Sequence, residues 1–346
     1  YTRQVNLKLG CRNERQTETL DFVLGNNKYQ FTNDYSQKLI SCPTGFGKTY
    51  IAVAALCYMN ARAIVITAAV DWLNQWEDRI HQYTDLDPKE ICHIKGSGTI
   101  FMLMNNPKLA MKYKIFLVTH ATIKSYGDEY GWDKVGEFFK ILNIMIKIYD
   151  EAHLYTNNIF KIDFYTNTWR TYYLTATPML SDVFKNKVFQ RAYATVPKID
   201  LYNQEEDAHT DYIAILYNSH PSVVDLQNSK TNYGFNIMWY SNYIVSRPVY
   251  YQVLWILLDE VLERKLSKDG KVLIYIGTNQ AIEYIKDWIE DHFPEFAGNV
   301  GIFTSISEKS TKNDNLNKKI ILSTTKSCGA AMDISNLEER SEEHTS

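Results

Sequence analysis

The stretch Ser41-Cys-Pro-Thr-Gly-Phe-Gly-Lys-Thr49 decides the fold of this chain. It continues the apolar run Lys38–Ser41, which predicts a strand, and it leads into Thr49–Met59, which predicts a helix. A glycine-rich turn between a strand and a helix lets backbone N–H groups approach phosphate oxygens, and the helix adds its positive N-terminus. The spacing G-x-G-K-T therefore predicts a phosphate-binding loop, although an ordinary loop can carry the same letters by chance.

The residue types within this loop suit particular contacts. We expect Lys48 to reach the β- and γ-phosphates and Thr49 to ligate Mg²⁺. Cys42 stands where the strict pattern G-x-x-x-x-G-K-[ST] has its first glycine, so the loop departs from that pattern at one position. The residues expected to surround the phosphates are Pro43, Thr44, Gly45, Phe46, Gly47, Lys48 and Thr49.

A second candidate site lies in the segment Ile148-Tyr-Asp-Glu-Ala-His153, where an apolar strand ends in adjacent carboxylates. Beside a phosphate loop, one carboxylate can hold Mg²⁺ and its neighbour can orient or activate the attacking water. We therefore assign Asp150 to the metal and Glu151 to the water. By themselves, two acids at the end of a strand can also serve only to cap a helix.

Short β-branched runs alternate with amphipathic helices along the chain, which predicts an α/β fold with mainly parallel sheets flanked by helices. In Val70–Tyr83, the side chains of Trp72, Trp76 and Ile80 recur every four residues, which predicts a helix with these residues in the core. The strands predicted for the first half are Lys38–Ser41, Ala63–Thr67, Ile115–Thr119, Ile144–Tyr149 and Tyr172–Thr175.

The polar, acidic stretch 197–227 predicts a junction between two domains, 1–196 and 228–339. The last residues, 340–346, resemble the translation of a sequencing adapter, so we expect an artefact there; a genuine polar tail is the alternative.

The polar segment Ser307–Asn317 is predicted to be a loop. Elements predicted for the second half are helix Val249–Leu266, strand Val272–Ile276, a helix carrying Ile282, Ile285 and Ile289, and strands Val300–Thr304 and Lys319–Ser323.

Composition excludes several classes of protein. With 45% hydrophobic and 22% charged residues among 346, the chain can bury a core and is not expected to be disordered. Its 37 basic and 40 acidic residues give a formal charge of −3, so binding to a polyanion would need a local groove. No apolar run is long enough to predict a membrane span. The five cysteines never form C-x-x-C, which favours a reducing cytoplasm over disulfides or a zinc site.

The motifs CPTGFGKT, DEAH and Leu174-Thr-Ala-Thr-Pro178, in this order and spacing, resemble superfamily 2 helicases and translocases of the DEAD/DEAH type. The resemblance implies two RecA-like domains that clamp ATP and Mg²⁺ between them and bind nucleic acid across their top. The family's final arginine-rich motif, due some way after Asp333, is absent. We attribute this to truncation, so the second domain is expected to be incomplete.

The resemblance also carries roles onto single residues. Gln16 resembles the glutamine that reads adenine, with a solvated helix residue as the alternative, and Gly329 and Asp333 resemble a later motif that touches the nucleotide. The groups that resemble those coupling hydrolysis to domain movement are His153, Thr175 and Thr177. The residues that resemble nucleic-acid contacts are Thr67, Gln75, Thr119, Thr122, Thr278, Ser323 and Thr324.

The expected function is that of an ATP-hydrolysing motor on nucleic acid. DNA is favoured over RNA, by analogy with DNA repair, phage and large-virus motors, and a viral motor would work in the host cytoplasm. The motor subunit of a restriction system carries the same motifs and stays open as an alternative. A nucleotide-gated clamp or annealing factor is a third possibility, which the presence of Glu151 disfavours because mere binding has no need of it. The sequence does not indicate an oligomeric state.

Overall fold

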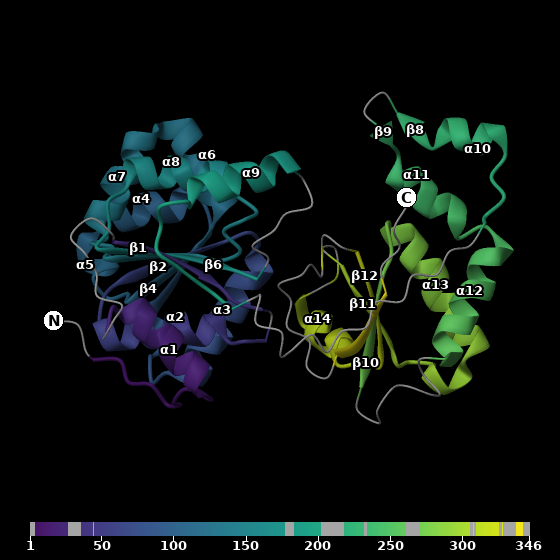
Figure 1. Cartoon of the computed structure of the whole chain (residues 1–346), viewed down its shortest axis with the longest axis horizontal. Coiled ribbons are helices and arrows are strands. Elements are labelled where there is room, and N and C mark those ends of the chain that lie inside the picture. Colours follow the sequence, from purple (N-terminus) through teal and green to yellow (C-terminus); the bar gives the residue numbers. More distant parts are fainter. Residues whose placement is uncertain are drawn as a thin grey trace. The chain divides into compact units, whose positions relative to one another are not determined.

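The computed structural model describes residues 4–26, 36–43, 45–176, 183–201, 218–231, 234–260, 270–304, 307, 309–324, 327 and 337–341. The chain divides into two compact units, Tyr1–His209 and Thr210–Ser346. Each unit is built around its own sheet, with helices against it (Figure 1). None of the helices in the described ranges is both long enough and apolar enough to cross a bilayer.

The first unit contains a seven-stranded sheet with the order β3-β4-β2-β5-β6-β1-β7, in which every pair of neighbours is parallel. The prediction of a parallel α/β fold is thus confirmed. Because the strands are parallel, their carboxyl ends meet at one edge of the sheet, where the candidate site residues follow them. The strands are β1 (Gln37–Ser41), β2 (Ala63–Thr67), β3 (Ile91–Ile94), β4 (Ile115–Thr119), β5 (Ile146–Tyr149), β6 (Arg170–Thr175) and β7 (Lys198–Asp200).

Helices cover both faces of this sheet (Figure 1). One face carries α1 (Glu14–Leu24), α2 (Lys48–Met59) and α3 (Val70–Tyr83). The other carries α4 (Ser97–Asn105), α5 (Pro107–Ala110), α6 (His120–Tyr130), α7 (Trp132–Ile141), α8 (Thr156–Tyr165) and α9 (Val183–Ala192). Two separate apolar cores result, one on each face of the sheet.

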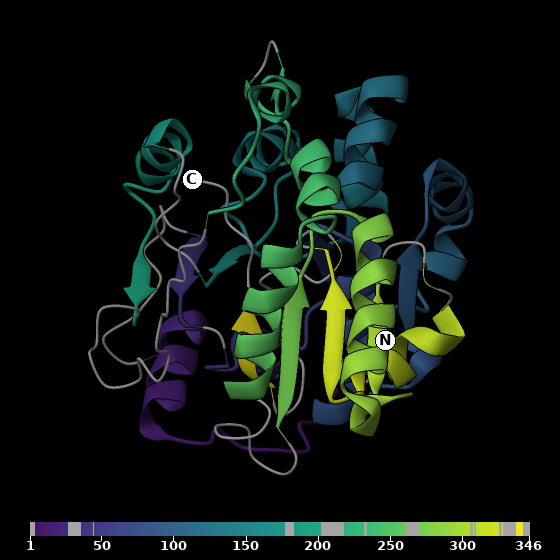
Figure 2. The ribbon, with the colours of Figure 1, turned by 90° about the vertical axis from the view of Figure 1, so that its right-hand side faces the viewer.

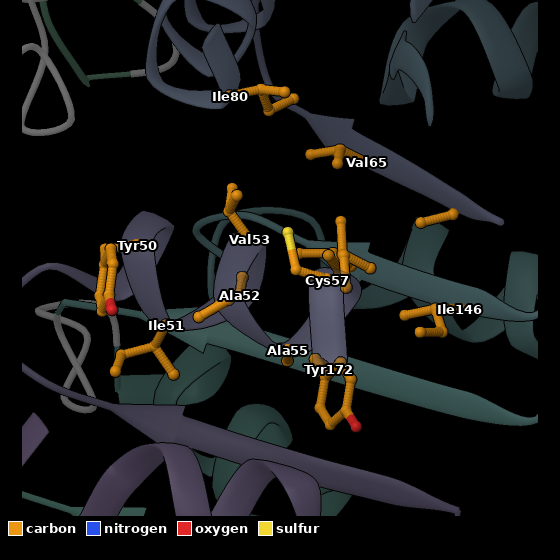
Figure 3. Packing of buried hydrophobic residues seen from close by; sticks show 14 of the residues in the cluster. Tyr50, Ile51, Ala52, Val53, Ala55, Cys57, Val65, Ile80, Ile146 and Tyr172 are labelled. Atoms are coloured by element: carbon orange, nitrogen blue, oxygen red, sulfur yellow. The ribbon is translucent and has the colours of Figure 1, made fainter. Parts of the chain in front are cut away.

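Helix α2 fixes the loop that precedes it because it is buried over almost its whole length. Figure 3 shows its side chains in one apolar cluster with Val65 of β2, Ile146 of β5 and Tyr172 of β6. A helix held on so many sides gives the loop at its N-terminus a fixed position, which a binding site needs.

The second unit contains a four-stranded parallel sheet in the order β11-β12-β10-β13. Helices α12 and α13 lie against one face of it (Figure 2), and Ile282, Ile285 and Ile289 of α13 are buried there, as predicted. Its strands are β10 (Lys271–Tyr275), β11 (Val300–Phe303), β12 (Ile320–Ser323) and β13 (Leu337–Ser341), with a hairpin of β8 (Lys230–Thr231) and β9 (Gly234–Phe235). Its helices are α10 (Val223–Asn228), α11 (Ile237–Ile244), α12 (Pro248–Asp259), α13 (Asn279–His292) and α14 (Lys309–Leu316).

The structure differs from the sequence-based expectation in several elements, and strands β3, β8, β9 and β13 were not predicted. The segment predicted as a loop, Ser307–Asn317, contains helix α14, which has no apolar period to reveal it. Gly301 makes room for this helix, because a Cβ there would lie 2.3 Å from the carbonyl oxygen of Asn315. The stretch expected to be the junction begins with β7, a short strand that pairs with β1 and continues the first sheet. Strand β13 includes Arg340 and Ser341, the start of the adapter-like segment.

Candidate functional site

The loop between β1 and α2 has a backbone path that two glycines make possible. Gly45 has φ 81° and Gly47 has φ 98°, in the left-handed region that favours glycine. A Cβ on Gly47 would lie 2.7 Å from Nε2 of Gln16, so a side chain does not fit there. Lys48 Nζ donates to the carbonyl oxygens of Cys42 (2.9 Å) and Pro43 (3.3 Å). The ammonium group is therefore held inside the curve of the loop, at the N-terminus of α2.

The beginning of α1 supports the loop from outside. Gln16 is 1% exposed; its Nε2 donates to the carbonyl of Phe46 (2.6 Å) and its Oε1 accepts from the backbone N–H of Arg12 (2.8 Å). The Arg12 guanidinium donates to the carbonyls of Gly45 (2.8 Å) and Phe46 (3.0 Å). Both ends of the Gln16 amide are thus occupied within the protein. Sequence reasoning singled out Gln16 but not Arg12, whose role depends on where the loop lies in space.

Cys42, which replaces the first glycine of the strict pattern, is fully buried against the core below the sheet. Burial raises the pKa of its thiol to about 12, so the group stays protonated and behaves as a small apolar side chain. The departure from the pattern therefore places an inert thiol under the loop.

Asp150 and Glu151 directly follow β5 and form a desolvated pair. Asp150 Oδ2 accepts from the indole N–H of Trp76 (2.8 Å), and its Oδ1 accepts from the backbone N–H of Glu151 (3.1 Å). Burial raises the pKa of both carboxyl groups, and the charge of Glu151 raises that of Asp150 further. The positive charge of Lys48 acts on both in the opposite direction. Lys48 in the loop therefore favours the charged form of both carboxylates.

Trp76 was predicted only as a core residue. Trp76 is buried as expected, whereas Trp72 is half-buried. The indole N–H of Trp76 also orients Asp150. Glu151 has φ 47°, an uncommon conformation for a residue with a side chain, and its Oε2 accepts from the N–H of Ala176 (3.3 Å). Glu151 is thus hydrogen-bonded both to Asp150 and to Ala176, the residue that follows β6.

His153 lies between Glu151 and Thr175, the last residue of β6. Its Nδ1 lies 2.9 Å from Oγ1 of Thr175 and 3.3 Å from Oε2 of Glu151. Burial lowers the pKa of this imidazole to about 4, and the charge of Lys48 lowers it further, so the ring is neutral near pH 7. The contact with Glu151 is therefore not an ion pair near pH 7. The structure brings together three sequence-predicted residues, His153, Thr175 and Glu151.

The chemistry of this donor set fits a magnesium-bound nucleoside triphosphate. A glycine turn that excludes side chains, an ammonium at a helix N-terminus and a buried carboxylate pair are what phosphates and Mg²⁺ need. Among the described residues, no three His, Cys, Asp or Glu side chains group closely enough to hold a metal by themselves. Mg²⁺ suits such a site, because it is commonly held by one or two carboxylates plus substrate phosphates and water.

The predicted nucleic-acid contacts of the first unit lie at the carboxyl ends of neighbouring strands. Thr67 and Thr119 are register partners at the ends of β2 and β4. Thr67 is buried and donates to the carbonyl of Ala69 (3.0 Å), while Oγ1 of Thr119 accepts from the N–H of Thr122 (3.2 Å). Gln75 is half-buried on α3. These hydroxyls hold the turns at this edge of the sheet.

In the second unit the corresponding residues also follow neighbouring strands. Thr278 caps α13, accepting from the N–H of Ala281 (3.2 Å), and donates to Oδ1 of Asn242 (2.6 Å). Ser323 is fully buried and donates to the carbonyl of Phe303 (2.5 Å). Thr324 donates to the hydroxyl of Ser327 (2.8 Å). The predicted site residues Thr44, Thr177, Gly329 and Asp333 lie outside the described residues.

Comparison with known proteins gives a consistent result. The family model described as "Type III restriction enzyme, res subunit" matches residues 12–180. The DNA 3'-5' translocase XPB2 of Sulfurisphaera tokodaii is 36% identical over 50 residues, which are 14% of this chain and 11% of that protein. The matched segment is thus a small part of that relative.

Two solved structures share the fold. The structure of Mss116p (NTE and C-tail double deletion) bound to ssRNA and AMP-PNP matches with a TM-score of 0.56 at 14% identity, over 91% of this chain and 61% of that one. S. cerevisiae Dbp5 bound to RNA and ADP BeF3 matches with a TM-score of 0.57 at 12% identity, over 94% of this chain and 73% of that one. In its motifs, in the family match over residues 12–180 and in its RecA-like fold, the chain is similar to the superfamily 2 helicases and translocases.

Proposed function

We propose that this chain is a motor that hydrolyses Mg·ATP to move along or unwind nucleic acid, with DNA favoured over RNA. One observation carries the proposal: the buried carboxylates Asp150 and Glu151 are electrostatically coupled to Lys48 in the glycine-rich loop. A protein that only bound nucleotide would have no use for a second desolvated carboxylate beside the first.

In the proposed reaction each group has a separate task. Lys48 would exchange the carbonyls of Cys42 and Pro43 for phosphate oxygens, while Asp150 and Thr49 would hold Mg²⁺, which neutralises phosphate charge. Glu151 would orient the attacking water and accept its proton. Its raised pKa, which burial causes, suits a general base because it makes the carboxylate a stronger acceptor of a proton.

The relatives are named with different nucleic acids. The relative XPB2 is named as a DNA translocase, whereas the Mss116p and Dbp5 structures are bound to RNA. The turns at the ends of β2 and β4, which Thr67 and Thr119 hold, would supply contacts to the phosphate backbone, and such contacts carry little sequence information. We therefore expect weak sequence preference, with DNA as the stronger activator.

Steady-state ATP hydrolysis by this chain tests the proposal, measured without polymer and with single-stranded DNA, duplex DNA or RNA. We expect stimulation by DNA. Glu151→Gln should lower kcat by about 10²–10⁴-fold, the range of general-base catalysis, and leave ATP binding in place. Glu137→Gln, an exposed change on α7, is the matched control and should leave kcat unchanged. ATP binding without hydrolysis under any condition would contradict the motor and favour a nucleotide-gated clamp.

The motor subunit of a restriction system is the second candidate, because the matching family model carries that description. Such a motor can translocate on duplex DNA without separating its strands. Displacement of a third strand from a triplex, with no displacement from a partial duplex, would favour this candidate over a helicase.

A further inference from the structure

A column of four stacked rings crosses the carboxyl edge of the first sheet. The rings of Tyr155 and His120 lie 4.7 Å apart at 14°, and those of His120 and Tyr149 lie 5.9 Å apart at 12°. The column continues from Tyr149 to Tyr173 on β6, at 5.5 Å and 3°. The rings of His120, Tyr149 and Tyr173 are buried, whereas Tyr155 is 38% exposed. Near-parallel stacking of the buried rings makes a stiff contact between elements that are remote in the sequence.

The two middle rings of this column, those of His120 and Tyr149, belong to residues that adjoin the two candidate sites. His120 lies between Thr119 and Thr122, the expected nucleic-acid contacts, and Tyr149 directly precedes Asp150. Strands β4 and β5 are not neighbours in the sheet, since β2 lies between them. The His120 ring therefore makes a direct side-chain link across the end of β2.

His120 is held firmly in this place. It is 1% exposed, and Nδ2 of Asn158 donates to its carbonyl (3.2 Å) and lies 3.2 Å from its Nδ1. Protein interiors have few voids, so a shift of the α6 N-terminus must also displace the buried ring of Tyr149. A ligand that moves the turn at Thr119 would in this way move the backbone that carries Asp150.

Neither a change of charge near neutral pH nor a hydrogen bond from Nε2 explains why a histidine stands at position 120. Nε2 of His120 is buried without a hydrogen-bond partner among the described residues, and burial lowers the pKa of the imidazole to about 3. The ring is neutral in the physiological range, and no carboxylate uses its free nitrogen. Position 120 therefore needs a flat ring that fits between Tyr149 and Tyr155.

We propose that His120 is a positioning residue that couples polymer binding at the Thr119–Thr122 turn to the carboxylates Asp150 and Glu151. The inference rests on the proposed function. It adds the physical link between the two binding events, which is the stacked column.

The test measures thermodynamic coupling in the full chain, without hydrolysis. Fluorescence anisotropy gives the Kd for labelled oligothymidylate, with and without a non-hydrolysable ATP analogue and Mg²⁺; the ratio is the coupling factor. In the wild type we expect a factor of about 5–150, the usual range for coupled sites. His120→Ala should bring the ratio to about one, while each ligand alone binds within about threefold of wild type. His120→Phe should restore coupling, because it keeps the ring.

Two further variants separate the column from general packing. Tyr155→Ala removes the outer ring and should also reduce the coupling factor. Tyr130→Ala lies on the same helix as His120, packs against Phe101 and Tyr126 outside the column, and should leave the factor unchanged. Thermal unfolding of every variant reports whether the fold is intact.

The possible failures can be told apart. A wild-type coupling factor in His120→Ala overturns the inference alone. Equal losses of both single-ligand affinities, with no rescue by His120→Phe, show a merely structural residue and also overturn it. A wild-type chain that binds neither oligothymidylate nor oligouridylate overturns the proposed function, and the inference falls with it.

Discussion

Asp150 and Glu151 make the first unit less stable than it would be without them. Burial raises the pKa of each carboxyl group, so the folded protein binds these protons more tightly than the unfolded chain does. The free energy of unfolding therefore decreases as pH rises from the ordinary carboxyl range through the raised pKa values. When both groups are ionised, the folded protein carries the energetic cost of two buried charges, which is typical of residues kept for function.

We expect Asp150→Asn to stabilise the protein at pH 7.5. The amide carries no charge, and its oxygen can still accept from Trp76. A gain of about 1–2 kcal/mol would raise Tm by roughly 2–8 °C in a unit of this size. Thermal unfolding from pH 7.5 down to pH 4 should show the gain shrinking, because the wild-type carboxyl becomes protonated.

Asp128→Asn is the matched control. This exposed aspartate has a pKa lowered by its hydrogen bonds to Lys124 and Trp132, so its charge is favourable in the folded state. Its replacement should give no gain at pH 7.5. A Tm for Asp150→Asn below wild type at every pH would contradict the account of the carboxylate pair.

At the scale of elements, one aspartate joins α8 to two strands. Asp163 Oδ1 accepts from Lys147 Nζ (2.5 Å) and from the hydroxyl of Tyr149 (2.8 Å), and its Oδ2 accepts from the hydroxyl of Tyr173 (2.6 Å). Lys147 is 1% exposed and also donates to Oγ1 of Thr166 (2.7 Å). This buried cluster anchors the helix that follows the DEAH segment.

Asp163→Asn should lower the free energy of unfolding by about 3–5 kcal/mol, because it leaves the Lys147 ammonium buried without a counter-charge. Urea unfolding measures the change. Asp133→Asn, on the exposed surface of α7, should have little effect. A double variant that also replaces Lys147 by Met should recover much of the loss. Equal destabilisation by the single and double variants would show that the charge is not the cause.

The elements that sequence patterns predicted are those with a strong apolar period or run. Strands β2 and β4 and helix α3 begin and end at the predicted residues. Helix α14 was wrongly predicted as a loop because its stability comes from packing beside Gly301, which no local pattern records. Strand β7 has only three residues, and its partner β1 is remote in the sequence.

The same limit applies to the candidate site. Loop and DEAH residues could be named from their order alone, since each follows a strand of a parallel sheet. The contacts that orient them could not be: the indole of Trp76 and the guanidinium of Arg12 reach the site through tertiary packing. Sequence spacing fixes the backbone position of a residue, whereas its hydrogen-bond partners depend on elements far along the chain.

For the whole molecule, the formal charge of −3 means that any attraction to a nucleic acid is local. We expect binding to single-stranded DNA to be strongly salt-dependent. If about five phosphates are neutralised, the affinity should fall roughly a hundredfold between 50 and 200 mM NaCl. Anisotropy titrations on several sequences should give the same slope for each. A salt-independent affinity would contradict contacts to the phosphate backbone.

The place of β1 in its sheet has a consequence for synthesis on the ribosome. This strand carries the phosphate-binding loop, yet its two neighbours are β6, which begins at Arg170, and β7, which ends at Asp200. Until those residues have left the exit tunnel, the nascent chain holds β1 with both edges bare, and bare strand edges promote aggregation. The phosphate-binding motif is thus translated well before the strands that pair with β1, so slow elongation before residue 200 would prolong dependence on chaperones.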